Sequence, residues 1–199
     1  MLHYESVSER LLEILRGCMA SPAFDGFCLA GGTSLALRIG HRISIDIDLF
    51  GSSDVHGEDV LSRLSELGPM TLLKQSPNIR ISSIHGVKVD LVNYRYPLLA
   101  PPEVIDGIRL ISLSDLAAMK LNAIAGRGSR RDFIDLYFLL RTYSLDQMMA
   151  FYAAKYPDGN AFLVRKSLTY FDDAEQEAMP RMLEPVDWQH IRTTIAALS

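Results

Sequence analysis

Apolar positions recur along the first part of the chain with two different periods. Between residues 6 and 20 they keep the three-to-four-residue spacing of a helix with one buried face. After residue 42 they alternate with polar residues, as in a strand that buries one side. We therefore expect a helix over 6–20 and a strand over 43–49. The helical set comprises Val7, Leu11, Ile14, Leu15, Cys18 and Met19, and the alternating set comprises Ile43, Ile45, Ile47 and Leu49.

Between these two elements, a short apolar run is interrupted by Gly31 and Gly32. Two adjacent glycines allow a tight turn and leave backbone amides uncovered. Thr33 or Ser34 can then cap a helix that ends at Gly40. A glycine turn that leads into a helix N-terminus is suited to binding an anion such as phosphate.

The strand over 43–49 carries two acidic residues on the same side, because Asp46 and Asp48 are two positions apart. A divalent cation relieves the repulsion between such carboxylates, and oxygen ligands suit Mg²⁺. A later strand over 87–92 alternates in the same way and places Asp90 on its non-core face. If that strand runs beside the first, Asp90 becomes a third metal ligand; the alternative is an ordinary solvated aspartate.

The remaining patterns predict an α/β fold: a small mixed sheet with flanking helices, followed by a C-terminal helical bundle. We expect a core over 1–111, which carries the glycine turn and the three aspartates, and a helical region over 112–199 that packs on this core. The individual expectations are helices over 56–67, 112–125, 132–140, 145–156, 159–171 and 187–198, strands over 70–74, 79–84 and 108–111, and a proline-containing loop over 94–107.

Composition and charge narrow the class of protein. The 199 residues are 48% hydrophobic and 22% charged, which fits a globular chain. The net charge of −4 excludes a broadly basic nucleic-acid surface but not a local basic patch. Cys18 and Cys28 lack metal-binding spacing, which indicates reduced core residues of a cytoplasmic protein. No apolar run has transmembrane length and the N-terminus does not read as a signal peptide, so we expect no membrane association.

One lysine stands in an apolar helical context. Lys120 lies among Ala, Leu and Met residues, where a lysine either extends to solvent or serves an anionic ligand. An arginine cluster follows, and then Asp132 and Asp135. These two aspartates can be structural partners of the arginines, and Asp132 can also cap its helix.

Two blocks of this sequence resemble a known family. Gly31-Gly32-Thr33-Ser34 followed by Asp46-x-Asp48 resembles the signature of the DNA polymerase β nucleotidyltransferase superfamily. More narrowly, the chain is similar to the AbiEii/MenT-type nucleotidyltransferases, which are toxins of bacterial type IV toxin–antitoxin systems. The two blocks are LAGGTSLALRIGHRISIDIDLF and LAAMKLNAIAGRGSRRDFIDLYFLL.

The resemblance implies a polymerase-β-like core that transfers a nucleoside monophosphate from an NTP to an acceptor hydroxyl. It implies two Mg²⁺ ions on the three aspartates, an active-site lysine at Lys120 and a downstream aspartate, for which Asp135 fits the family pattern better than Asp132. The metal ligands would be Asp46, Asp48 and Asp90, and the nucleotide-binding residues Gly31, Gly32, Thr33, Ser34 and Lys120, with Arg42 or Arg38 as helpers.

The resemblance also points to partners that the residues themselves do not identify. It implies an RNA acceptor, especially the 3′ end of tRNA, and a cognate antitoxin that is a DNA-binding repressor. Two alternatives stay open at this point: a nucleotidyltransferase that modifies a protein or a small molecule, and a non-catalytic, partner-binding relative.

Overall fold

The computed structural model describes residues 1–198 and divides the chain into two compact units. The predicted boundary between residues 111 and 112 is where the chain enters the second unit for the last time, but two short earlier segments also belong to that unit. The first unit comprises Met1–Gly40, Ser44–Arg95 and Pro102–Ile111, and the second comprises His41–Ile43, Tyr96–Pro101 and the chain from Ser112 onward.

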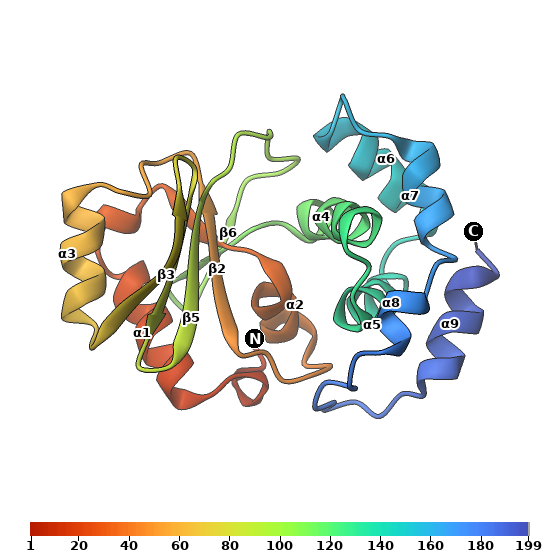
Figure 1. The fold of residues 1–199 in the computed structure, drawn as a ribbon, viewed down its shortest axis with the longest axis horizontal. Helices are drawn as coiled ribbons and strands as arrows, with labels where there is room; N and C mark the ends of the chain where they lie inside the picture. The colour runs from red at the N-terminus through yellow and green to blue at the C-terminus, as the bar shows by residue number, and fades with distance from the viewer. Residues whose placement is uncertain (199) are drawn as a thin grey trace. The chain divides into compact units, whose positions relative to one another are not determined.

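The first unit is built on a seven-stranded sheet with the strand order β3-β4-β5-β2-β1-β7-β6 (Figure 1). The pairs β2–β5 and β1–β7 are parallel and the other neighbours are antiparallel, so the sheet is mixed, as expected. The strands are β1 (Phe27–Leu29), β2 (Asp46–Gly51), β3 (Met70–Ser76), β4 (Ile79–Ile84), β5 (Val87–Asn93), β6 (Glu103–Ile105) and β7 (Ile108–Leu110).

Helices cover both faces of this sheet. Figure 1 shows α1 (Glu9–Met19) and α3 (Glu58–Glu66) on one side and α2 (Gly31–Ile39) on the other. Ser8 is the N-cap of α1, and its hydroxyl accepts a hydrogen bond from the Leu11 amide. Short 3₁₀ turns occupy Tyr4–Ser6 and Pro22–Phe24.

The core of the first unit lies on the side of α1 and α3. Ile47 and Leu49 of β2 and Val89 and Leu91 of β5 are buried there together with the apolar face of α1. Cys18 belongs to this core, and burial raises the pKa of its thiol to about 12. Both cysteines are free, as predicted.

Three local predictions were wrong. Strand β2 starts at Asp46, and Ile45 is 63% exposed. The segment His41–Ile43 belongs to the second unit, where Ile43 donates to the Arg181 carbonyl at 2.8 Å. Helix α2 starts at Gly31 with Ala30 as its cap residue, so neither Thr33 nor Ser34 caps it. The stretch expected as a loop contains β6, which pairs with β7.

The second unit is helical, and its longest helix, α4, packs against α5, α6 and α7. Serine hydroxyls cap three of its helices: Ser112 for α4, Ser129 for α5 and Ser144 for α6. The helices are α4 (Leu113–Gly126), α5 (Arg130–Leu139), α6 (Leu145–Lys155), α7 (Ala161–Ser167), α8 (Asp172–Glu175) and α9 (Trp188–Ala196).

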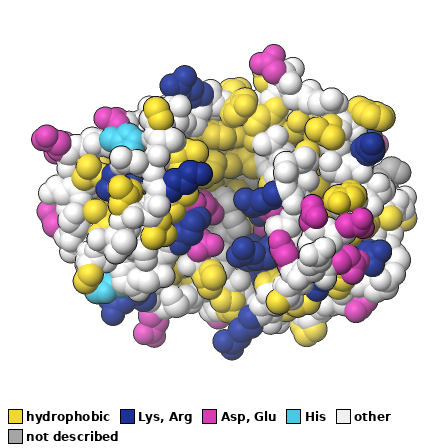
Figure 2. Space-filling model, in the orientation of Figure 1, with side chains coloured by type: hydrophobic (Ala, Val, Ile, Leu, Met, Phe, Trp, Pro, Cys, Tyr) yellow, Lys and Arg dark blue, Asp and Glu magenta, His cyan; other side chains and the backbone are white. Residues whose placement is uncertain are grey.

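The surface carries both signs of charge. On the face shown in Figure 2, acidic and basic side chains are interspersed, in keeping with the small net charge. Over residues 1–198, no helix is long and apolar enough to cross a membrane.

A fully buried ion pair ties α4 to α6 inside the second unit. Lys155 Nζ lies 2.6 Å from Asp115 Oδ1 and donates to the Pro97 carbonyl at 2.9 Å. Asp115 also accepts from the Leu99 amide at 3.1 Å and from the Ser112 hydroxyl at 2.6 Å. Each charge is therefore matched, and the segment Tyr96–Pro101 is fastened to the helices by these bonds.

Replacement of Lys155 tests this pair. We expect Lys155→Met to lower the free energy of unfolding by about 3–5 kcal/mol, because the Asp115 carboxylate stays buried without its cation. Lys166→Met, at an exposed position of α7, should change it by less than about 0.5 kcal/mol. Urea unfolding measures both. Recovery of stability when Asp115→Asn is added supports the explanation, and an unaltered midpoint in Lys155→Met contradicts it.

Candidate functional site

The predicted carboxylates lie together on one face of the sheet. β2 and β5 run parallel, and their register places Asp48 opposite Asp90 and Asp46 opposite Lys88. Because side chains alternate along each strand, all four point away from the face that buries Leu49 and Leu91. The prediction that Asp90 comes beside the Asp46–Asp48 strand is thus confirmed. We call Asp46, Asp48 and Asp90 the acidic face.

Lys88 lies on the same side of the sheet as the acidic face, and its role was not predicted from the sequence. Its Nζ lies 2.6 Å from Asp90 Oδ2, and its side chain is 41% exposed. The other oxygen, Asp90 Oδ1, is buried and has no hydrogen-bond partner among the described residues. The signal was present in the sequence, since Lys88 is two residues from Asp90 and therefore on the same side of its strand.

The glycine turn lies directly against the acidic face. The Ala30 amide donates to the Asp48 carbonyl at 2.8 Å, and α2 begins at the next residue. Gly31 has a φ of 64°, and a Cβ at this position would overlap the Asp48 carboxylate. Only glycine combines this backbone conformation with such a close approach. The first amides of α2, which have no partner within the helix, therefore start beside Asp48.

The hydroxyl of Thr33 holds β2 to α2. Thr33 is fully buried; its Oγ1 donates to the Asp46 carbonyl and lies 2.8 Å from the Ser44 hydroxyl. Ser34 is also fully buried, and its Oγ has no partner among the described residues. A phosphate-binding role for the amides of Gly31, Gly32, Thr33 and Ser34 stays a prediction. The Thr33 hydroxyl already has a structural role, because it bonds to β2 and to Ser44.

The acidic face has the right donors for Mg²⁺, although they are not gathered as a cluster. Over residues 1–198, no three side chains of the His, Cys, Asp and Glu types converge closely enough to hold a metal. Lys88 pairs with one oxygen of Asp90 instead. Carboxylate oxygens on adjacent strands and the orphaned Asp90 Oδ1 fit a hard divalent cation.

The predicted lysine and aspartates meet inside the second unit. Lys120 Nζ lies 2.6 Å from Asp135 Oδ2 and 3.0 Å from Asp132 Oδ1. Arg42 donates to both oxygens of Asp135, at 2.7 and 2.9 Å, and His41 Nε2 lies 2.8 Å from Asp135 Oδ1. Asp135, which the family pattern favoured over Asp132, therefore contacts Lys120, Arg42 and His41.

Asp132 has its own set of partners. Arg127 donates to its two oxygens at 2.8 and 3.1 Å, and the Ser129 hydroxyl donates at 2.7 Å. Ser129, not Asp132, caps α5. Both aspartates therefore contact Lys120, and their catalytic roles stay predictions.

The ionisation of this cluster follows from its contacts. Burial pushes the pKa of Asp135 up, but Arg42 and Lys120 outweigh it and hold that pKa well below its ordinary value. Burial pushes the pKa of Lys120 down, but the two carboxylates outweigh it and the pKa is raised. Burial lowers the pKa of His41, against the opposing effect of Asp135. The aspartates and Lys120 are therefore charged at neutral pH.

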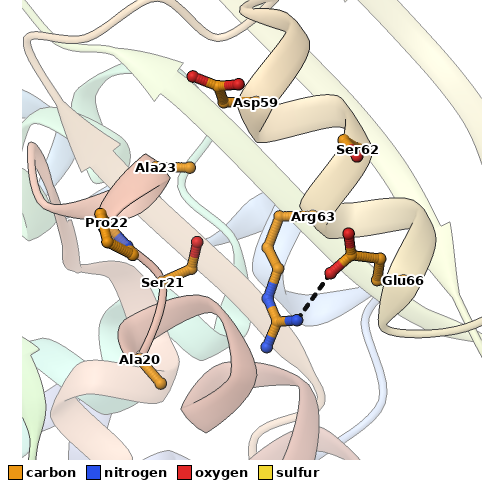
Figure 3. Close-up of a pocket in the computed structure, with 8 residues that line it drawn as sticks. All are labelled: Ala20, Ser21, Pro22, Ala23, Asp59, Ser62, Arg63 and Glu66. Atoms are coloured by element: carbon orange, nitrogen blue, oxygen red, sulfur yellow. Dashed lines mark hydrogen bonds and ion pairs between the residues drawn. The ribbon is translucent and has the colours of Figure 1, made fainter.

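A separate hollow of about 580 Å³ lies on the α1 and α3 side of the sheet (Figure 3). The segment Ala20–Ala23 faces Asp59, Ser62 and Glu66 of α3 across it. Arg63 pairs with Glu66 at 2.9 Å and donates to the Gly17 carbonyl, so its guanidinium is already engaged. This hollow is on the opposite side of the sheet from the acidic face.

The fold is that of solved nucleotidyltransferases. A putative nucleotidyltransferase from H. pylori superposes with a TM-score of 0.57 at 16% identity, covering 96% of this chain and 90% of that one. ANT(2'')-Ia, solved in complex with adenylyl-2''-tobramycin, gives a TM-score of 0.58 at 16% identity, covering 75% of this chain and 98% of that one.

The sequence specifies the family. Residues 13–198 match the family described as "Nucleotidyl transferase AbiEii toxin, Type IV TA system". The uncharacterized protein aq_aa25 of Aquifex aeolicus (strain VF5) is 37% identical over 173 residues, covering 84% of this chain and 83% of that protein. The chain therefore belongs to the AbiEii nucleotidyltransferase family, as the resemblance had implied.

The Lys88–Asp90 pair leads to a prediction about metal affinity. We expect Lys88→Met to bind Mn²⁺ roughly three- to tenfold more tightly than the wild type, because the ammonium no longer competes for Asp90 or repels the cation. Lys74→Met, at an exposed position of β3, is the matched control. Isothermal titration calorimetry of metal binding, without nucleotide, measures the effect. Equal affinities in the wild type and Lys88→Met contradict the competition.

The second-unit cluster leads to a prediction about stability. Asp135→Asn should lower the free energy of unfolding by about 3–5 kcal/mol, because Arg42 and Lys120 lose a buried countercharge. Asp146→Asn breaks an exposed pair with Arg165 and should cost at most about 1 kcal/mol.

The pH dependence of Asp135→Asn gives a second measurement. A carboxyl group whose folded pKa is depressed stabilises above its unfolded pKa, and this contribution is lost as pH falls through the folded value. The stability difference between wild type and Asp135→Asn should therefore be constant from pH 7 down to the ordinary carboxyl range and shrink only below it. A difference that disappears already at pH 6 is inconsistent with this cluster.

Proposed function

We propose that this AbiEii-family nucleotidyltransferase uses RNA, specifically the 3′ end of tRNA, as its acceptor, and that this reaction makes it the toxin of a type IV toxin–antitoxin pair. The transfer of a nucleoside monophosphate is the activity of its class. The observation that carries the location of the chemistry is the register that sets Asp48 opposite Asp90, with the N-terminus of α2 starting beside Asp48.

The residues of the first unit would bind metal, bind phosphate and accept a proton. Asp46, Asp48 and Asp90 would hold two Mg²⁺ ions, which when bound supply positive charge to the phosphoryl oxygens. The amides at Gly31 and Gly32 would receive the β- and γ-phosphates, because the N-terminus of α2 attracts negative charge. Asp90 has an unpartnered oxygen suited to accept the proton of the acceptor hydroxyl.

The residues of the second unit support a separate role. Lys120 would neutralise triphosphate charge, and Asp135 would position it rather than react, since Asp135 is fully buried among Lys120, Arg42 and His41. Arg42 is likewise held by Asp135 in a two-point contact. A cognate antitoxin is the partner that the family description implies.

A second candidate is transfer to a small molecule. It is favoured by the solved structure of ANT(2'')-Ia, which holds adenylyl-2''-tobramycin. The experiment below also examines a protein as the acceptor.

The test compares acceptors and a metal-ligand variant. The protein is incubated with each α-labelled NTP, Mg²⁺ and, separately, tRNA, total protein or small hydroxyl compounds. We expect wild type to label the 3′ end of tRNA. The control Asp59→Asn, at an exposed α3 position on the other side of the sheet, should label it equally well. Asp48→Asn should give labelling lower by roughly a thousandfold or more, because the loss of one carboxylate disrupts metal binding.

The outcomes separate the candidates. Label on protein or on a small molecule, with none on tRNA, replaces the RNA acceptor by the alternative. Undiminished labelling by a folded Asp48→Asn protein contradicts the acidic face as the site. Expression without a neighbouring antitoxin should arrest growth for wild type and not for Asp48→Asn; arrest by both separates toxicity from this site.

A further inference from the structure

A buried arginine on the opposite face of the sheet is left without a partner. Arg80 lies on β4 opposite Leu91 of β5, so it points to the side of α1 and α3. It is 8% exposed, and its Nε is buried with no hydrogen-bond partner. Across residues 1–198, no hydrogen bond or ion pair is made by its guanidinium. A cation in that position is costly unless something outside the chain pairs with it.

Other arginines show that this is not the rule in the molecule. The Nε atoms of Arg38 and Arg192 are also buried without an acceptor. Each of those guanidinium groups nevertheless pairs with a carboxylate, Arg38 with Glu103 at 3.1 Å and Arg192 with Glu175. Arg80 differs because no carboxylate reaches it.

Arg80 lines a hollow of about 470 Å³. His56 and Leu61 border it from the α3 side, and the β3–β4 hairpin supplies the rest of the wall. His56 Nε2 lies 2.8 Å from the Ser76 carbonyl, which fixes the segment before α3 to the hairpin. None of the described residues that line the hollow is acidic; they are His56, Leu61, Gln75, Ser76, Pro77 and Arg80.

Helix α3 begins two residues after His56 in the sequence. Gly57 is the cap residue of this nine-residue helix and provides no side-chain cap, so the first amides of α3 have no partner from a cap side chain. Glu58 and Asp59 of the first turn are exposed and stand in water. Among the described residues that line the hollow, none belongs to this first turn, so Arg80 supplies the positive charge there.

We infer that this hollow, defined by Arg80, His56, Gln75 and Ser76, is a phosphate-binding site separate from the acidic face. A guanidinium presents planar pairs of N–H donors that match phosphoryl oxygens, and the Gln75 and Ser76 side chains add neutral polar groups. The ligand is a phosphoryl group, either free, as pyrophosphate or inorganic phosphate, or part of an RNA backbone. A strand of RNA held here would be anchored away from the reacting end.

The experiment follows the Arg80 side chain itself. Arginine Nε–H resonances are recorded on the ¹⁵N-labelled full chain, and the Arg80 signal is the one lost in Arg80→Met. Pyrophosphate, inorganic phosphate and a short single-stranded RNA are titrated separately, without NTP or metal. We expect the Arg80 signal to shift and saturate, and calorimetry to show binding to this site at least tenfold weaker in Arg80→Met.

Matched variants keep the result interpretable. Arg95→Met removes an exposed arginine of the same unit and should leave the affinity within about twofold. Arg80→Lys keeps the charge but loses the two-point contact, so it should bind less tightly than wild type and more tightly than Arg80→Met. Asp48→Asn should retain the Arg80 response, which separates this site from the proposed catalytic one.

Each outcome decides the proposal. A response to pyrophosphate that RNA does not displace supports a free phosphate ligand, and a response to RNA at lower concentration than to pyrophosphate supports a backbone phosphate. An Arg80 signal that does not shift with any of the three probes overturns the proposal. So does a response to an acidic peptide but to no phosphate, or a gain in stability in Arg80→Met with phosphate binding unchanged.

Discussion

The parallel pairing of β2 with β5 is the constraint on which the rest of the first unit depends. It fixes Asp48 beside Asp90 and places like charges on one face of a sheet, where they repel. The opposite face offsets that cost, because Ile47, Leu49 and Leu91 are fully buried there and each contributes about 1.5–3 kcal/mol. The Ala30–Asp48 and Thr33–Asp46 hydrogen bonds then lock the glycine turn and α2 against the charged strand. Hydrophobic burial on one side thus maintains an electrostatically unfavourable arrangement on the other.

Much of this arrangement could be predicted from the sequence because it depends on local periodicity. Alternation in β2 and β5 assigned each aspartate to the non-core face, and glycines marked the turn before α2 and its end at Gly40, where φ is 72°. The prediction failed at Ile45, which continues the alternation but lies outside the strand. The cause is non-local: the backbone just before it bonds to the chain near Arg181, far along the sequence. Strand β6 was missed for a related reason, since it is short and is defined only by its pairing with β7.

Partners of charged residues were the least predictable part. Arg42 and Asp135 are separated by 93 positions, and nothing in either segment states that they meet. The sequence identified Lys120 as unusual because of its apolar neighbours, but not that two aspartates and Arg42 would form one cluster with it. Lys88 and Arg80 were overlooked because an isolated cation on a strand reads as an ordinary solvent-facing residue. The significance of Lys88 comes from its contact with Asp90 on the same strand, and that of Arg80 from its burial without an anion.

The two units treat buried charge in opposite ways, and the difference indicates where ligands belong. In the second unit each buried carboxylate has its cations: Asp135 has Arg42 and Lys120, and Asp115 has Lys155. Such pairing stabilises the buried charges and fixes the position of Lys120. In the first unit, one face of the sheet leaves an oxygen of Asp90 unsatisfied and the other leaves the guanidinium of Arg80 without an anion. Asp90 keeps an open oxygen despite its pair with Lys88, and Arg80 has no anion, so the first unit offers a position for a cation on one face and for a phosphoryl group on the other. The same sheet would then hold the reacting groups on its acidic side and an anchoring contact on its reverse.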